Sequence, residues 1–262
     1  ALAALEMGDV DGLPYLDPKD AKRLESNEKL AIYSAPDYLR YAILFLNNNA
    51  PPFNEKAVRQ AVACAIDKNK VVQTVLDGQG VPGKGPISPA SWAFDPKAKS
   101  YEYDPKKAES LLDAAGWVDS NGDGVREKDG TDLSFVILTN DNSRRIKTGE
   151  LVAEDLRKIG FKTEVQATGW MDLLKGYVAP RTFKAMIAEQ WLLTADPDVF
   201  SLWHSSQAGN GGFNLAGISN NRIDSLLEES RLTVDRARRT QLYSEFQQLW
   251  AEECPSVLLY YP

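Results

Sequence analysis

Residues 133–167 read LSFVILTNDNSRRIKTGELVAEDLRKIGFKTEVQA, and this stretch decides the fold class. It begins with an apolar run at 133–139, which predicts a strand. Apolar residues then recur at helical spacing from 146 to 159, and Gly160 follows as a typical helix stop. Alternating apolar and polar residues at 161–167 predict a second, half-buried strand. A strand, a helix of about a dozen residues and another strand favour a right-handed crossover between two parallel strands.

Helix and strand patterns alternate along the rest of the chain as well, which predicts an α/β fold. The clearest helix is bracketed by Asp104 as N-cap, Pro105 as first helical residue and Gly116 as stop. A stretch rich in Gly, Pro and Ser at 78–100 predicts a long loop. Further strands are expected at 10–15, 38–47, 183–188 and 256–261, and further helices at 1–8, 18–24, 55–65, 68–76, 170–177, 221–232 and 235–253.

The composition is that of a globular protein with an acidic surface. The chain has 262 residues, 43% of them hydrophobic, enough for one large domain or two modest ones. Its net charge of −7 argues against nucleic acid or an anionic membrane as the main partner. No apolar run approaches the roughly 20 residues that span a bilayer. The chain opens on ALAALEMGDV, as if inside a helix, and stops as a strand ends at SVLLYYP, so we expect a fragment.

Residue types suited to catalysis are scarce, and we predict no catalytic residue and no cofactor. Cys64 and Cys254 both sit beside apolar residues, either as two buried thiols or as one disulfide. His204 is the only histidine, which removes a zinc-binding pair, and a structural role is expected for it. No serine lies in a nucleophile elbow. Carboxylate pairs are numerous, so a carboxylate-based hydrolase stays open as an alternative function.

The stretch DSNGDGVREKDG at 119–130 has the spacing of half a calcium-binding loop. Asp119, Asn121 and Asp123 would supply alternate oxygens, and Gly124 would permit the sharp turn. The bidentate Glu that closes such a loop is missing, since Gly130 stands in its place. The alternative to a calcium-stabilised module is a polar turn that leads into a hairpin.

Candidate ligand-binding residues lie at the ends of predicted strands. Ligands of open α/β sheets bind beyond the carboxyl ends of the strands, where Trp170 and Trp191 are expected. An aromatic wall with Thr194 and Asp196 would suit a polar organic ligand. The alternative is that Trp191 belongs to the core and that Asp196 and Asp198 cap the helix after Pro197.

A glycine-rich stretch, GNGGFN at 209–214, is the remaining candidate. It lacks the Lys of a phosphate-binding P-loop and does not follow a strand, so we interpret it as a flexible loop. Asn214 is its most plausible ligand-facing residue.

Several stretches together resemble the bacterial extracellular solute-binding proteins that include oligopeptide-, dipeptide- and nickel-binding proteins. They cover essentially the whole chain in the family's order, and Asn47 in the strand signature is expected to be structural. The stretches are ALAALEMGDVDG, LFLNNNAPPFNEKAVRQAVACAIDKNKVVQTVLDGQG, YDPKKAESLLDAAGW with DSNGDGVREKDG, and NNRIDSLLEESRLTVDRARRTQLYSEFQQLWAEECPSVLLYY.

The resemblance implies a fold of the type II periplasmic-binding-protein kind, with a mixed sheet flanked by helices. Residues 43–262 would form the C-terminal lobe, and residues 1–42 a remnant of the first lobe that leads into the hinge. The implied function is capture of an oligopeptide or dipeptide by lobe closure, and its delivery to an ABC permease with its ATPase, without bond chemistry. Such a protein works as a monomer outside the cytoplasm, in the periplasm or extracellularly, peripheral to the membrane and either lipid-anchored or free.

The resemblance also bears on the ligand. Family peptide binders have a Trp followed three residues later by an Asp that meets the peptide amino terminus. Trp191 matches that Trp, but Thr194 stands in the Asp position and Asp196 lies two places further on. Trp170 resembles another tryptophan of the family's cleft. An oligopeptide is therefore the default ligand, and an oligosaccharide or another neutral ligand is the alternative.

Overall fold

The predicted crossover forms the backbone of the structure, a computed structural model that describes residues 1–262 except 15, 17, 192–195 and 210. Strand β5 (Ser134–Asn140) pairs in parallel with β6 (Lys162–Thr168), from Ser134 opposite Lys162 to Asn140 opposite Thr168. Helix α6 (Ser143–Arg157) connects them. It begins three residues earlier than its apolar spacing indicates, because the Asn142 side chain caps it by accepting the Arg145 N–H at 3.1 Å.

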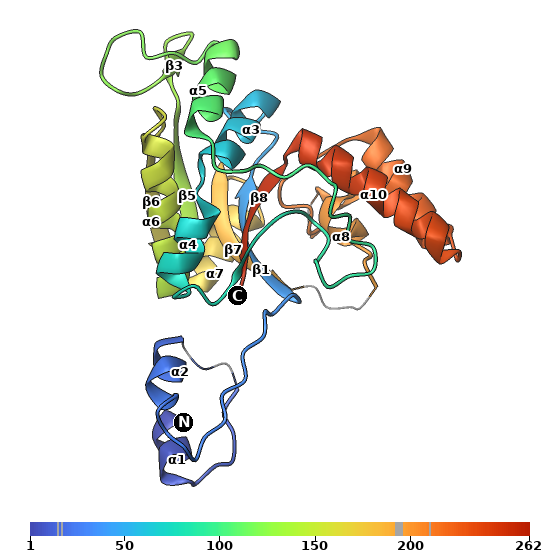
Figure 1. The fold of residues 1–262 in the computed structure, drawn as a ribbon. Helices are drawn as coiled ribbons and strands as arrows, with labels where there is room; N and C mark the ends of the chain where they lie inside the picture. The colour runs from blue at the N-terminus through green and yellow to red at the C-terminus, as the bar shows by residue number, and fades with distance from the viewer. Residues whose placement is uncertain (15, 17, 192–195, 210) are drawn as a thin grey trace.

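The main sheet is mixed and has the order β2-β8-β1-β7-β5-β6 (Figure 1). Strand β5 is parallel to β6 and to β7 (Ala185–Trp191), whereas β1 (Arg40–Leu46) is antiparallel to both β7 and β8 (Ser256–Tyr261). The short β2 (Val81–Pro82) pairs with β8 at one edge. β1 is buried from Tyr41 to Leu46, which explains its nearly unbroken apolar sequence.

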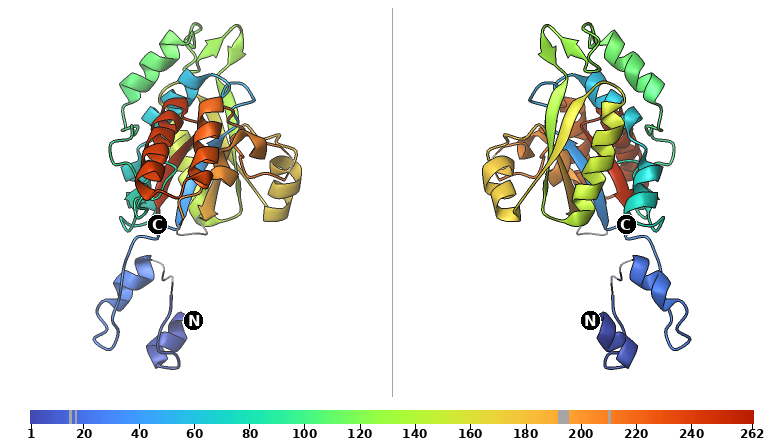
Figure 2. Two further views of the ribbon diagram at one scale, coloured as in Figure 1. Left: turned by 90° about the vertical axis from the view of Figure 1, so that its right-hand side faces the viewer. Right: turned by 90° about the vertical axis from the view of Figure 1, so that its left-hand side faces the viewer.

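Helices cover both faces of this sheet, and each face has its own apolar core (Figure 2). One core joins the sheet to helices α3 to α6, and the other joins it to helices α7 to α10. The remaining bounds are α3 (Lys56–Ala65), α4 (Lys68–Val75), α5 (Pro105–Ala114), α7 (Trp170–Leu173), α8 (Phe200–Trp203), α9 (Asn221–Leu232) and α10 (Arg236–Glu253). No described helix has the length and apolar character of a membrane-spanning segment.

The first 39 residues lie apart from this body (Figure 1). Helices α1 (Leu2–Met7) and α2 (Pro18–Leu24) are held together by an ion pair from Arg23 to Glu6, and an extended stretch leads from them to β1. The strand predicted at 10–15 is wrong over the described residues 10–14, which form bends without a pairing partner strand. The predicted boundary at 42/43 falls inside β1, whose pairing with β7 starts at Arg40.

Two other elements differ from their sequence patterns. The helix predicted at 170–177 has one α-helical turn, α7, followed by a π-helical turn at Leu174–Val178. The strand predicted at 183–188 is displaced and runs through Trp191, because its register is set by pairing with β1. The 119–130 turn leads into a small hairpin of β3 (Glu127–Lys128) and β4 (Thr131–Asp132), as its alternative interpretation predicts.

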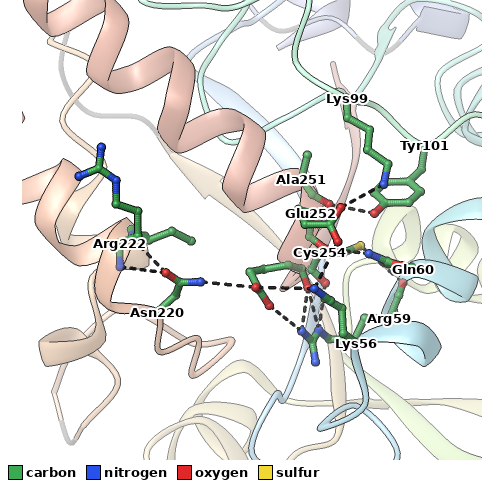
Figure 3. A network of polar contacts seen from close by, with 12 residues as sticks. Lys56, Arg59, Gln60, Lys99, Tyr101, Asn220, Arg222, Ala251, Glu252 and Cys254 are labelled. Atoms are coloured by element: carbon green, nitrogen blue, oxygen red, sulfur yellow. Dashed lines mark hydrogen bonds and ion pairs between the residues drawn. The ribbon is translucent and has the colours of Figure 1, made fainter. Parts of the chain in front are cut away.

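A buried arginine joins the two cores at the end of α10 (Figure 3). Arg59 of α3 is 5% exposed and donates hydrogen bonds to the carbonyl oxygens of Phe53, Glu253 and Cys254 at 2.7–3.2 Å. The last carbonyls of a helix lack partners within the helix. The guanidinium supplies them, and it thereby fixes the point where α10 turns into β8.

Candidate functional site

The carboxyl ends of the parallel strands meet at one edge of the sheet, and this edge is the candidate site. Asn140 ends β5 opposite Thr168 at the end of β6, and Trp191 ends β7 opposite Arg40 at the start of β1. The segment from α2 therefore enters the sheet at the same edge, where the Asp37 N–H also donates to the Pro262 carbonyl at 2.6 Å. The topology thus places the strand ends beside the passage to the first 39 residues (Figure 1).

A half-buried ion pair marks this edge. Arg145, in the first turn of α6, donates from Nη1 to Asn140 Oδ1 at 2.9 Å and from Nη2 to Glu189 Oε2 at 3.2 Å. The side chains of Arg145 and Glu189 are 17% and 11% exposed. Arg145 Nε is buried and makes no hydrogen bond within the described part of the chain. A planar guanidinium and a carboxylate side by side can bind the polar groups of an organic ligand, such as carbonyls, carboxylates, amines or hydroxyls.

Trp170 is the described aromatic side chain of the predicted set. It begins α7 directly after β6 and Gly169, and its side chain is 48% exposed. An exposed indole at a strand end offers a flat apolar surface together with one N–H donor. The structure therefore leaves Trp170 available for stacking against a ligand, as its place in the sequence predicts.

The other predicted residues between β7 and α8 are described only in part. The main chain of Trp191 closes β7, but its side chain and the whole of Thr194 lie outside the described residues. Asp196 forms a bidentate ion pair with Arg239, and that guanidinium lowers the pKa of the carboxyl group. Asp198 accepts the N–H of Phe200 at 3.0 Å, so it caps α8 as the alternative interpretation predicts.

Asn214 contradicts its prediction as a ligand-facing residue. Its side chain is 0% exposed, and its amide donates to the carbonyls of His204 and Ile218 at 3.1 and 2.9 Å. Its oxygen accepts the N–H groups of Gly217 and Ile218. Four backbone groups of a loop without regular structure need partners, and Asn214 supplies them all. The glycine-rich sequence gave no sign of this need.

The candidate calcium loop binds its own backbone. Asp119 accepts the N–H groups of Gly122 and Gly124 at 2.7 and 2.9 Å, and Asp123 accepts that of Val125. These are hydrogen bonds of a polar turn. Over the part of the chain that the structure describes, no group of three or more His, Cys, Asp and Glu residues is placed to hold a metal ion.

The single histidine and the two cysteines occupy structural positions. His204 stacks on Phe200, and its Nδ1 accepts the Ser206 N–H at 3.1 Å, so the ring proton is on Nε2, which faces Glu228 at 3.2 Å. Nδ1 is thereby used as a cap and is not left to act as a base. Cys64 and Cys254 are both free and buried, and burial raises the pKa of Cys254 to about 12, so the thiols are protonated at neutral pH.

Sequence reasoning missed Arg145, Glu189 and Asn140. A signal was present, since the polar run NDNSRR directly follows the apolar strand and EQW ends the next parallel one. Their convergence became visible only with the strand order, which places β5 between β6 and β7. Asn47, expected to be structural, does donate to the buried carbonyls of Arg181 and Phe183.

Comparisons with known proteins agree on one family. Residues 1–212 match the family described as bacterial extracellular solute-binding proteins, family 5 Middle. An oligopeptide-binding protein, AppA, of Bacillus subtilis is 35% identical over 100% of this chain and 48% of its own length. A heme-binding protein A of Haemophilus influenzae is 29% identical over 97% of this chain and 45% of its own. The chain thus spans about half the length of the curated relatives it matches.

Solved structures agree with the fold. The structure of AppA from Bacillus subtilis in complex with a nonapeptide superposes with a TM-score of 0.88 at 34% identity, over 100% of this chain and 52% of that one. The predicted resemblance and the predicted mixed-sheet α/β fold of the periplasmic-binding-protein kind are therefore confirmed.

Proposed function

The chain belongs to the bacterial extracellular solute-binding proteins of family 5, and we propose that it is the ligand-binding lobe of the substrate-binding component of an ABC importer. Residues 43–262 are the C-terminal lobe in this proposal, and residues 1–42 are a remnant of the first lobe. The proposed ligand is an oligopeptide or dipeptide. The similarity to an oligopeptide-binding protein over the full length of this chain supports that ligand.

The observation that carries the proposal is the composition of the carboxyl edge of the sheet. An exposed indole at Trp170 and the half-buried pair of Arg145 and Glu189 offer stacking, donors and acceptors on one edge. A peptide backbone needs all three. We propose that Trp191 and Thr194 complete this surface, since both follow β7 at the same edge.

The proposed mechanism is binding followed by closure of a second lobe over this edge. Closure hides the ligand from water and strengthens the polar contacts that hold it. The closed form then docks on a membrane permease, which an ATPase drives from the other side. No step makes or breaks a covalent bond, and the protein acts outside the cytoplasm as a monomer.

A neutral ligand such as an oligosaccharide is the second candidate. Two observations favour keeping it, namely the Thr at position 194 and the engagement of Asp196 with Arg239. The relatives also differ in what their names say they bind, as the heme-binding protein illustrates.

The test is a thermal-shift screen of the full-length protein with dipeptides, nonapeptides and oligosaccharides. A ligand that binds only the folded state raises the melting temperature according to its saturation. A shift with peptides that is lost in Trp191→Ala supports the peptide carrier and the site. A shift with oligosaccharides alone keeps the transport role and changes the ligand. Hydrolysis of any of these compounds without a shift would sink the proposal in favour of a hydrolase.

A further inference from the structure

Two arginines of the α9–α10 hairpin bind the connection that leaves the candidate site. Arg239 of α10 holds Asp196 in a bidentate pair, with Nη1 to Oδ2 at 3.1 Å and Nη2 to Oδ1 at 2.8 Å. Arg231 of α9 holds Asp198 through Nε and Nη2 at 3.0 and 2.8 Å. Both helices thus grip the same short segment between β7 and α8.

Both guanidinium groups are held in place by aromatic rings. Arg239 lies 5.3 Å from the Trp92 ring centroid and donates to the Tyr243 hydroxyl at 3.3 Å. Arg231 lies 3.8 Å from the Phe200 ring centroid. The Arg239 side chain is only 18% exposed. A guanidinium fixed by stacking loses little conformational entropy when it binds a carboxylate bidentately, so these pairs hold more firmly than ordinary surface ion pairs.

The two aspartates in turn order the backbone. Asp196 Oδ1 accepts the Asp198 N–H at 3.1 Å, and Asp198 Oδ1 accepts the Phe200 N–H at 3.0 Å. Each carboxylate therefore binds an arginine on one side and the main chain on the other. Asp196 comes only five positions after Trp191, whose main chain is fixed by pairing with Arg40. The clamps are thus the first described anchor beyond the carboxyl end of β7.

We propose that Arg239 and Arg231 are positioning residues for ligand binding, which act by holding the β7–α8 connection at the candidate site. The inference rests on the proposed function. It gives Asp196 the role of an anchor that is engaged by Arg239, in place of the direct ligand contact that its sequence position suggests. Binding groups must be held by a supporting shell to keep their geometry, and the α9–α10 hairpin supplies that shell from outside the cleft edge.

The same two helices contain a matched control. Arg222 of α9 makes a bidentate pair with Glu245 of α10 at 2.7 Å for both bonds, with side chains 51% and 45% exposed. It has the geometry of the clamps but binds no part of the β7–α8 connection. Arg222→Gln therefore removes a comparable ion pair and leaves the site alone.

The experiment measures the binding of a random-sequence nonapeptide pool to the full-length protein and its variants, from the concentration dependence of the melting temperature. We expect Arg239→Gln and Arg231→Gln to weaken apparent affinity about tenfold, because loss of the supporting contacts misplaces the binding groups. Arg239→Lys keeps the charge and is expected to restore part of that loss. Arg222→Gln should stay within about twofold of the unmodified protein, since exposed pairs contribute little.

Asp196→Asn separates an anchor from a ligand contact. If Asp196 acts through Arg239, then Asp196→Asn, Arg239→Gln and the double variant lose the same affinity. Additive losses, or a larger loss in Asp196→Asn alone, would show direct contact and overturn the role given to Asp196. Affinity of Arg239→Gln equal to that of Arg222→Gln would overturn the whole inference. If Arg239→Gln does not fold, Arg239→Lys and Asp196→Asn carry the same comparison.

Hydrogen exchange without ligand tests the clamp independently of the proposed function. The amides of Asp198 and Phe200 should exchange faster in Arg239→Gln and remain protected in Arg222→Gln, because their acceptors lose their anchor. Failure of the unmodified protein to bind any peptide would refute the peptide carrier, and the exchange comparison would still decide on the clamp. Unchanged exchange in Arg239→Gln overturns it.

Discussion

Replacement of Arg59 by Met is the sharpest stability test that the structure offers. The guanidinium is 5% exposed and serves the carbonyl oxygens of Phe53, Glu253 and Cys254 at the junction of α3, α10 and β8 (Figure 3). Met fills a similar length with apolar atoms and donates nothing. The substitution therefore leaves three carbonyls, two of them at a helix end, without their charged donor.

The magnitude follows from those three acceptors. A buried polar group left without its partner costs about 1–3 kcal/mol, and hydrogen bonds to charged groups lie at the upper end. Water that enters beside the smaller polar load recovers part of this cost, so we expect a loss of about 3–4 kcal/mol in the free energy of unfolding. For a chain of this size that corresponds to a fall in melting temperature of about 6–16 °C.

The assay is urea unfolding, with Lys56→Met as the control from the same network. Lys56 pairs with Glu252 at 3.2 Å, but both side chains are about half exposed, at 44% and 50%. Such a pair contributes roughly 0–1 kcal/mol. A loss below about 1 kcal/mol for Arg59→Met, equal to that of Lys56→Met, would refute the reasoning that the guanidinium is needed at the end of α10.

Other consequences can be measured in the same way. Burial lowers the pKa of Lys68 to about 8, so the folded state binds fewer protons than the unfolded state between pH 8 and the ordinary lysine range; the difference in stability between the unmodified protein and Lys68→Met should rise over that window by about 1–2 kcal/mol, as followed by urea unfolding at each pH. Asn214→Ala should lose about 2–4 kcal/mol of stability because four backbone groups lose their partner, while unchanged peptide affinity in the folded fraction would confirm that Asn214 is no ligand contact. Arg145→Gln should weaken peptide binding about tenfold, whereas Arg157→Gln at the other end of α6 should not, and equal affinities in isothermal titration would remove Arg145 from the site. Excess EDTA should leave the melting temperature unchanged, and a fall reversed by calcium would restore the metal interpretation of 119–130.

The sequence determined the local elements and the fold class on its own. The crossover at 133–167, the cap of α5 by Asp104 and Pro105, and the paired helices α9 and α10 depend on short-range periodicity and capping, which are written in adjacent residues. The strand predicted at 10–15 failed because an apolar run becomes a strand only when another strand pairs with it, and none is described there.

Only the tertiary structure decided which polar residues meet. Arg145 and Glu189 are 44 positions apart, and they form a pair because β5 lies between β6 and β7 in the sheet. Asp196 reads as a ligand residue in sequence, yet Arg239, 43 positions further on, engages it. Asn214 reads as an exposed loop residue, yet the loop folds around its amide. Local periodicity determines helices and strands, whereas the partner of a polar group depends on how distant segments pack, and no single stretch of sequence contains that information.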